Sequence, residues 1–127
     1  MSRTEGRTDA APAPAGPYSQ SVRIRAVVAA AGQVGSTPDG TVVDGVGPQT
    51  RQALANVAKV LEASGASMDD VISMRVFLTD PSQFDEMNQV YADAFRAPYP
   101  TRTTVYVGLP EGLLVEIDAL AVVEPTT

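Results

Sequence analysis

Two pairs of polar side chains on strand-like segments are the residues most able to do chemistry in this chain. Arg102 and Thr104 share one face of an alternating β-branched stretch, and Glu116 and Asp118 share one face of a second, because the side chains of a strand point alternately to two faces. A guanidinium is a two-pronged donor for anions, and a carboxylate can accept and return a proton. The elements that carry these groups decide whether they act together.

Residues 100–123 have the pattern of a β-hairpin, which would bring the four side chains together. Two alternating arms flank a joining segment with two glycines and a proline, residues typical of hairpin loops. Folding about this segment would place Arg102 and Thr104 opposite or diagonal to Glu116 and Asp118, within the roughly 5–8 Å reach of cross-strand neighbours. The other face of the second arm is wholly apolar and is predicted to be core.

Two interpretations of the facing charges stay open. The first is an ion pair that merely decorates a sheet surface. The second is a polar pocket at a subunit interface, which is favoured because Leu120 and Val122 continue the carboxylate face as apolar residues. That face would then be partly covered, and a charge removed from water needs a partner or a function.

The composition predicts one domain and excludes several classes of chemistry. The 127 residues are 44% hydrophobic, which suits a single globular domain with a real core. The chain has no histidine and no cysteine, which removes the nucleophile systems and the usual zinc or iron ligand sets built on those side chains. We therefore expect neither a metal nor a cofactor, and chemistry that uses carboxylates, arginine, hydroxyl groups and water.

Charge and hydropathy bear on the partners and the location of the chain. Its net charge of −6 and pI near 4.4 argue against a nucleic-acid partner, because phosphate binding needs clustered lysines and arginines. The apolar run 26–31 is too short to span a bilayer. The first ten residues are polar with no apolar run behind them, so no secretory signal is expected. We expect a cytoplasmic protein with no membrane partner.

The order of elements predicts an α+β domain. Residues 1–15 lack periodicity and are expected to form a mobile tail before a single domain over 16–124. Besides the hairpin arms, strands are expected at 16–24, with Val22 and Ile24 inward, at 26–34, and at 71–79, where Ile72 shares a face with Met74, Val76 and Leu78. Helices are expected from Pro48 towards Gly65 and after a capping Asp80. Their apolar stripes are Leu54, Val57, Ala58 and Leu61 in the first helix and Phe84, Met87, Tyr91, Ala94 and Phe95 in the second. Helices separated by strands predict a mixed sheet with both helices packed on one face.

The second face of that sheet would be uncovered in a monomer. Its apolar candidates are Val28, Ala30, Leu120 and Val122, and an apolar patch of this kind is unfavourable in water. We therefore predict a closed homo-oligomer that buries it, with Arg102 at or near a subunit boundary.

Tyr18 and Gly32 are each open to more than one interpretation. Tyr18 follows a Gly-Pro turn and is either a half-buried aromatic residue at the sheet edge or part of a site. Gly32 interrupts an apolar run, where it marks a bulge, a strand-ending turn or the close approach of a ligand.

Six segments in register resemble the reactive intermediate deaminase family, the YjgF-type proteins. They are Gly16–Gln20, Ala31–Gln33, Gln49–Val57, Met87–Tyr91, Pro100–Val105 and Val115–Ala119, and the resemblance runs in unbroken order from about Gly16 to Val123. It implies a chorismate-mutase-like fold, a homotrimer and a pocket between neighbouring subunits. Deaminating members hydrolyse 2-imino acids or their enamines, such as 2-aminoacrylate, 2-iminopropanoate and 2-iminobutanoate, to 2-oxo acids and ammonia.

Carried over by motif, the resemblance assigns roles to six residues. Arg102 would bind the substrate carboxylate, and Glu116 would position or activate the attacking water. The residues that would line the site are Tyr18, Gly32, Asn88 and Thr104. An imine carbon is already electrophilic, so this hydrolysis of a C=N bond needs neither a protein nucleophile nor a metal.

The chain also departs from the family pattern, and other functions stay open. Ala29 and Ala31 stand where relatives often carry an aromatic residue and a serine, which could widen the pocket, and Tyr106 replaces a smaller or acidic residue. A pathway-specific substrate would fit these changes. A non-catalytic regulatory protein that binds a small carboxylate at Arg102 is a second hypothesis. An endoribonuclease, a role ascribed to some relatives, is a third.

Overall fold

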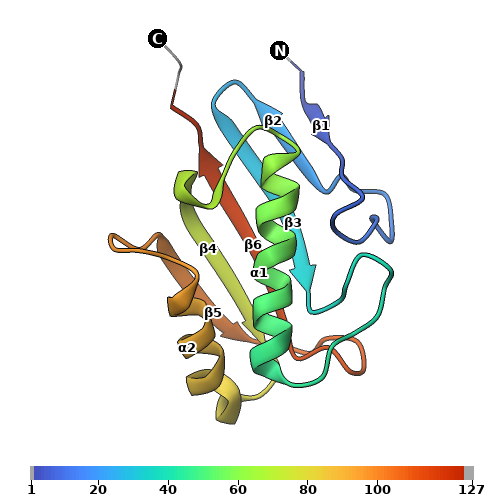
Figure 1. The fold of residues 1–127 in the computed structure, drawn as a ribbon, viewed down its shortest axis with the longest axis vertical. Coiled ribbons are helices and arrows are strands. Elements are labelled where there is room, and N and C mark those ends of the chain that lie inside the picture. Colours follow the sequence, from blue (N-terminus) through green and yellow to red (C-terminus); the bar gives the residue numbers. More distant parts are fainter. Residues whose placement is uncertain (1, 125–127) are drawn as a thin grey trace.

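The structure, a computed structural model, describes residues 2–124 and shows a six-stranded mixed sheet with two α-helices on one face (Figure 1). This confirms the predicted α+β class. Within the described range, no helix has the length and apolar character needed to cross a membrane. The elements are β1 Thr4–Gly6, β2 Ser21–Ile24, β3 Val27–Val34, α1 Val46–Glu62, β4 Val71–Leu78, α2 Phe84–Asp93, β5 Thr101–Tyr106 and β6 Val115–Val122.

The strand order places β6 in the middle of the sheet. The order is β1-β2-β3-β6-β4-β5, and β4 and β5 are parallel whereas the other neighbouring strands are antiparallel. Since β3 and β4 both run antiparallel to β6, they run in the same direction. Each helix therefore links two strands of equal direction, α1 from β3 to β4 and α2 from β4 to β5, as parallel strands require.

The predicted hairpin between the last two strands is wrong, because β4 lies between them. Arg102 of β5 pairs with Met74 of β4, and Glu116 of β6 pairs with Phe77 on the other edge of β4. The helix α2 carries the chain back alongside β4, so β5 becomes a parallel edge strand. Residues 107–114 then pass the end of β4 to reach β6 (Figure 1). Arg102 does not face a carboxylate across a hairpin.

The helix stripes predicted from the sequence form the core. Val57 and Leu61 of α1 are fully buried, and Met87 and Tyr91 of α2 are buried in the same core cluster. Fully burying an aliphatic side chain of this size contributes about 1.5–3 kcal/mol. This packing fixes α2 against β4 and β5, and so fixes what α2 presents to Arg102.

On the other face of the sheet the described part of the chain places no helix, and exposed apolar side chains line up across it. Ile24 of β2 pairs with Val27 of β3, which pairs with Val122 of β6, and Ala29 pairs with Leu120 in the adjoining row. The four larger side chains are 37–45% exposed. We call this side of the sheet the open face. It confirms the predicted uncovered apolar surface and the placement of Leu120 and Val122 on it.

The predicted faces of β2 and β3 are reversed. Val28 and Ala30 lie under α1 and are buried, not on the open face, whereas Ile24 and Val22 lie on the open face and not inside. The sequence of β3 is apolar at nearly every position, so alternation could not assign its faces. Ser21 settles the side of β2, because its hydroxyl donates a 2.6 Å hydrogen bond to a backbone carbonyl of α1.

The pairing of β6 with each of its two neighbours, β3 and β4, contains a shift in register. The pairing of β3 with β6 shifts between Ala30 and Gln33, which agrees with the bulge interpretation of Gly32. The pairing of β4 with β6 shifts just after Val71, and Ile72 is 50% exposed although strict alternation puts it on the same face as the buried Met74. A bulge adds one residue to a strand and re-aims its side chains, so it reverses the faces expected from strict alternation.

The predicted tail over residues 1–15 contains ordered structure and needs correction. Thr4–Gly6 pair with β2 as an edge strand. The buried side chain of Gln20 then holds the following segment: its Nε2 donates to the carbonyl oxygens of Thr8 and Pro12 at 3.0 and 2.9 Å, and its Oε1 accepts from the Thr8 N–H at 2.8 Å. The sequence pattern missed this strand because three residues are too few to show alternation.

Candidate functional site

Arg102 lies on the helix side of β5, against α2. Its Nη1 donates a 2.7 Å hydrogen bond to Oδ1 of Asn88. Its guanidinium carbon lies 4.7 Å from the ring centroid of Tyr91 and 5.6 Å from that of Phe84, both within cation–π range. The side chain is thus held by an amide and two aromatic rings of one helix.

No acidic side chain among residues 2–124 forms an ion pair with Arg102. Its Nη1 makes the one hydrogen bond that this guanidinium forms within the described chain, so Nε and Nη2 are left to donate to a ligand. The arginine also borders a cavity of about 460 Å³, lined by Asn88, Tyr91, Ala92, Tyr99, Pro100 and Arg102. A half-buried cation at a cavity with free donors is suited to bind an anion.

Thr104 shares the helix side of β5 with Arg102 but does not line that cavity. Its hydroxyl oxygen is buried and has no hydrogen-bond partner within residues 2–124. The Tyr91 hydroxyl is in the same situation. A buried polar group without a partner is unfavourable by about 1–3 kcal/mol, so both hydroxyls are candidates for contacts that this chain does not supply.

Glu116 lies on the open face, on the opposite side of the sheet from Arg102. It pairs with Val34 and Phe77 and is half-buried. Burial, and then the neighbouring charge of Asp118, raise the pKa of the Glu116 carboxyl above its ordinary value of 4.5. A Cβ on Gly32 would overlap Oε2 of Glu116. The absence of a side chain at Gly32 therefore leaves the space that this carboxylate occupies.

Asp118 binds Arg75, not Arg102. Its Oδ1 accepts from Nε of Arg75 at 3.0 Å, and its Oδ2 accepts from Nη2 at 2.5 Å. The guanidinium of Arg75 also lies 5.7 Å from the ring centroid of Phe77. The interpretation as a surface ion pair thus applies to Asp118, with Arg75 as the partner. Since the Arg75 side chain is 63% exposed, the pair contributes only about 0–1 kcal/mol to stability.

Tyr18 precedes β2 and is 51% exposed. Its hydroxyl oxygen accepts a 3.1 Å hydrogen bond from the backbone N–H of Ala15, which leaves the hydroxyl hydrogen free to be donated. Tyr18 borders a cavity of about 530 Å³ that Ala29 and Ala31 also line. The two alanines that depart from the family pattern therefore lie at this cavity, one and three residues before Gly32.

The expected site residues form two half-sites on opposite faces of the sheet. We call Arg102 with Asn88 the cationic half-site, and Glu116 with Gly32 and the adjoining Tyr18 the acidic half-site. Two strand spacings and three residues of rise separate Arg102 from Glu116, which is about 14 Å. A single chain does not bring the cation and this carboxylate together.

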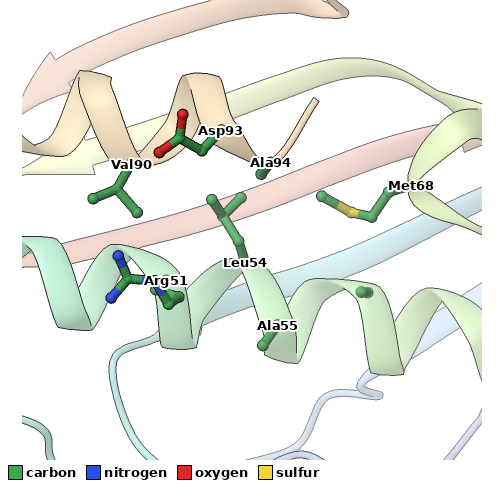
Figure 2. Close-up of a pocket in the computed structure, with 8 residues that line it drawn as sticks. Arg51, Leu54, Ala55, Met68, Val90, Asp93 and Ala94 are labelled. Carbon is green, nitrogen blue, oxygen red and sulfur yellow. The ribbon is translucent and has the colours of Figure 1, made fainter. Parts of the chain in front are cut away.

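A further cavity, of about 300 Å³, lies between α1 and α2 on the helix side (Figure 2). Figure 2 shows Arg51 on α1 and Asp93 on α2, with Leu54 and Val90 between them. None of the residues expected for the site lines this cavity.

Tyr91 and Phe84 are contacts of Arg102 that the sequence analysis did not assign to the site; it placed both in the apolar stripe of the helix. A signal for them was present. Phe84, Asn88 and Tyr91 are spaced i, i+4 and i+7 in α2, which puts two aromatic rings and an amide on one helix face. An arginine on the strand that follows such a helix is placed to contact all three.

Comparison with known proteins supports a family assignment. The family model described as Endoribonuclease L-PSP, which represents the YjgF/Rid proteins, matches residues 8–123. The chain therefore belongs to this family. A RutC family protein of Pyrococcus horikoshii is 44% identical over 117 residues, which cover 90% of this chain and 93% of that protein. The 2-iminobutanoate/2-iminopropanoate deaminase of Bos taurus is 39% identical over 123 residues, covering 94% and 90%.

A solved structure of a relative has the same fold. The crystal structure of E. coli TdcF with bound serine superposes with a TM-score of 0.90 at 38% identity and covers 95% of this chain and 99% of that one. The YjgF-type fold expected from the resemblance is thereby confirmed.

Proposed function

We propose that this chain is an imine and enamine deaminase that hydrolyses 2-imino acids of the 2-iminopropanoate and 2-iminobutanoate type to 2-oxo acids and ammonia, without a cofactor. The observation that carries the proposal is Arg102, a cation with free donors at a cavity and no acidic partner in the described chain. Relatives that are named deaminases support it. TdcF with bound serine also supports it, since serine, like a 2-imino acid, carries a carboxylate on its α-carbon.

The active form in this proposal is a homotrimer, in which the cationic half-site of one subunit meets the acidic half-site of its neighbour. Two features of the chain support a shared site. Arg102 and Glu116 are about 14 Å apart on opposite faces, so one copy cannot supply both. The apolar row on the open face and the unpaired edge of β5 are surfaces that a second copy would cover.

Arg102 anchors the substrate. Its Nε and Nη2 donate to the two oxygens of the carboxylate, and this planar fork fixes the direction of the neighbouring imine carbon. Tyr18 of the adjoining subunit donates its free hydroxyl hydrogen to the substrate or to the attacking water. Holding the reactants in a fixed geometry lowers the entropic part of the barrier.

Glu116 moves the protons. As the water oxygen bonds to the carbon of the protonated imine, the C=N electron pair moves to nitrogen and the Glu116 carboxylate takes a proton from the water, which gives a neutral carbinolamine. The resulting carboxylic acid gives this proton to the amine of the carbinolamine. The carbinol O–H then returns a proton to Glu116 while the C–N bond breaks, ammonia leaves and the C=O bond forms. General acid–base catalysis of this kind contributes about 10²–10⁴-fold, and a raised pKa suits a group that both accepts and donates.

The test is a panel of imines generated in situ by an amino-acid oxidase, with ammonia release measured for the wild type and Arg102→Ala. We expect Arg102→Ala to lower kcat/KM by about 100-fold or more, since it removes the charged anchor. The matched control is Arg51→Ala, an exposed arginine on α1 outside both half-sites. Equal rates for wild type and Arg102→Ala would defeat the proposal.

The same experiment separates the other hypotheses. A non-catalytic carboxylate-binding protein would bind 2-oxobutanoate through Arg102 without accelerating any imine. An endoribonuclease would bind and cleave RNA with an affinity that falls steeply with salt. The net charge of −6 does not favour that outcome.

A further inference from the structure

We propose that Asn88 and Tyr91 are positioning residues that hold Arg102 in place without neutralising it, so that its full charge stays available to the ligand carboxylate. This deepens the proposed function and rests on it, because it concerns how the same anchor selects a carboxylate. In this role neither residue needs to touch the substrate: Asn88 acts through its amide oxygen and Tyr91 through its ring.

The chain contains an internal comparison for this idea in Arg75 and Arg102. Both arginines lie over an aromatic ring, Arg75 at 5.7 Å from Phe77 and Arg102 at 4.7 Å from Tyr91. They differ in the acceptor. Arg75 is bound by the carboxylate of Asp118 through two of its nitrogens, whereas Arg102 is bound by a neutral amide through one. An amide fixes the guanidinium by a hydrogen bond but leaves its charge uncompensated.

The ring of Tyr91, not its hydroxyl, is the part that acts on Arg102. Tyr91 is 4% exposed, and its hydroxyl oxygen is buried without a hydrogen-bond partner among residues 2–124. The ring packs against Phe95, whose ring centroid lies 5.0 Å away at an interplanar angle of 44°. A rigid ring under the guanidinium restricts its rotation and attracts the cation through the π face. The charge is thereby held at the cavity in advance of the ligand.

Such positioning has a specific consequence for ligand choice. A carboxylate gains from an uncompensated cation, whereas a neutral amide of the same shape gains much less. Disturbing the positioning residues should therefore weaken carboxylate binding and leave amide binding nearly unaffected. Loss of folding stability alone would not produce that difference.

The decisive variant is Asn88→Asp, which replaces the neutral acceptor by a carboxylate at the same place. Binding of 2-oxobutanoate and of 2-oxobutanamide is measured by calorimetry on the full-length protein. We expect the Kd for 2-oxobutanoate to rise about tenfold, the Kd for the amide to stay within about twofold, and the unfolding temperature not to fall. Asn88→Asp that binds 2-oxobutanoate as tightly as the wild type would overturn the proposal.

A second set of variants tests the ring. Tyr91→Leu removes it, and we expect a loss of about tenfold in affinity for 2-oxobutanoate, seen in KM more than in kcat of imine hydrolysis. Tyr91→Phe keeps the ring and should recover most of that loss. The control is Val42→Ala, an exposed apolar residue before α1 that does not line the Arg102 cavity. An equal loss in Tyr91→Leu and Val42→Ala, or no recovery in Tyr91→Phe, would overturn the role of the ring.

Failure of this inference can be told apart from failure of the proposed function. If the wild type hydrolyses 2-imino acids and Asn88→Asp binds 2-oxobutanoate with unchanged affinity, the positioning role alone is wrong. If the wild type neither binds 2-oxobutanoate nor hydrolyses any imine, both the positioning role and the proposed function are wrong.

Discussion

The cationic and acidic half-sites hold charged groups of opposite sign on opposite faces of the same sheet. Arg102 is a cation that its own chain surrounds with an amide and two rings, and no acid of the described chain binds it. Glu116 is a carboxyl whose burial and acidic neighbour both raise its pKa. Each half-site thus keeps a charged group that its own chain stabilises poorly. Uncompensated charges lower stability, and in the proposed function each charge is kept for a partner outside the chain.

The comparison also explains why the two halves are built on different faces. The helix side of the sheet supplies rigid packing, which suits Arg102 as the proposed anchor. The open face supplies access, which suits Glu116 as the group proposed to exchange protons with water. A second copy that covers the open face would join the two properties in one cleft.

The largest effect that would break this comparison comes from keeping the copies apart. Leu120 is 38% exposed on the open face, and Leu120→Glu would place a charge in the predicted interface. We expect loss of assembly and a fall in imine hydrolysis of about 100-fold or more, because no complete site would form. Light scattering after size-exclusion chromatography measures the assembly. The control is Ala55→Glu, an exposed alanine on α1; an assembled and active Leu120→Glu protein would refute a shared site at this face.

A smaller effect should follow from Gly32→Ala. The added Cβ would overlap Oε2 of Glu116, which is the far end of a flexible side chain, so the carboxylate moves and the fold is kept. We expect kcat to fall by about tenfold with little change in KM. Steady-state kinetics on one imine measure both. A rise in KM at constant kcat would show instead that Gly32 belongs to carboxylate binding, the function assigned to the cationic half-site.

The smallest effect concerns the pH dependence of the acidic half-site. As a general base, Glu116 must be ionised, so kcat should rise with pH through a pKa above 4.5. Asp118→Asn removes one cause of that raised pKa and frees Arg75, so the rise of kcat should move to lower pH. In Glu116→Gln this rise of kcat should be absent. A rise that stays at the same pH in Asp118→Asn would show that another group controls it.

The same pKa has a consequence for stability. Because the folded pKa of Glu116 lies above its unfolded value, its contribution to stability is fully present below the unfolded pKa and is lost as pH rises through the folded pKa. The free energy of unfolding of Glu116→Gln should therefore decline less than that of the wild type as pH rises through that window. Urea unfolding at several pH values measures it.

The sequence predicted the elements well and their neighbours poorly. The apolar stripes of α1 and α2 are spaced in a way that only a helix satisfies, so they were identified from local pattern alone. The pairing of β5 was not, because its alternation fits either β4 or β6 as neighbour, and the glycines and proline between β5 and β6 also suit a hairpin. The deciding fact was the β4-α2-β5 crossover, which is a property of three elements together.

The prediction of which strand face is buried is wrong for a similar reason. The apolar run in β3 contains no polar residue to mark a side, and the bulge after Val71 turned Ile72 outward. For the site, residue types were enough to single out Arg102 and Glu116. Their separation on opposite faces depends on which strands pair, and the hairpin interpretation is wrong on that point. The proposal of a site shared between two chains therefore depends on the folded structure.

Complementation between two inactive variants tests the shared site most directly. Arg102→Ala and Glu116→Gln subunits, carrying different tags, are co-expressed, mixed trimers are isolated and imine hydrolysis is measured. If each site takes Arg102 from one chain and Glu116 from its neighbour, about one third of the sites in the isolated mixed trimers combine both intact residues. We therefore predict that about one third of wild-type activity returns. Mixed trimers as inactive as either variant alone would contradict a site divided between two chains.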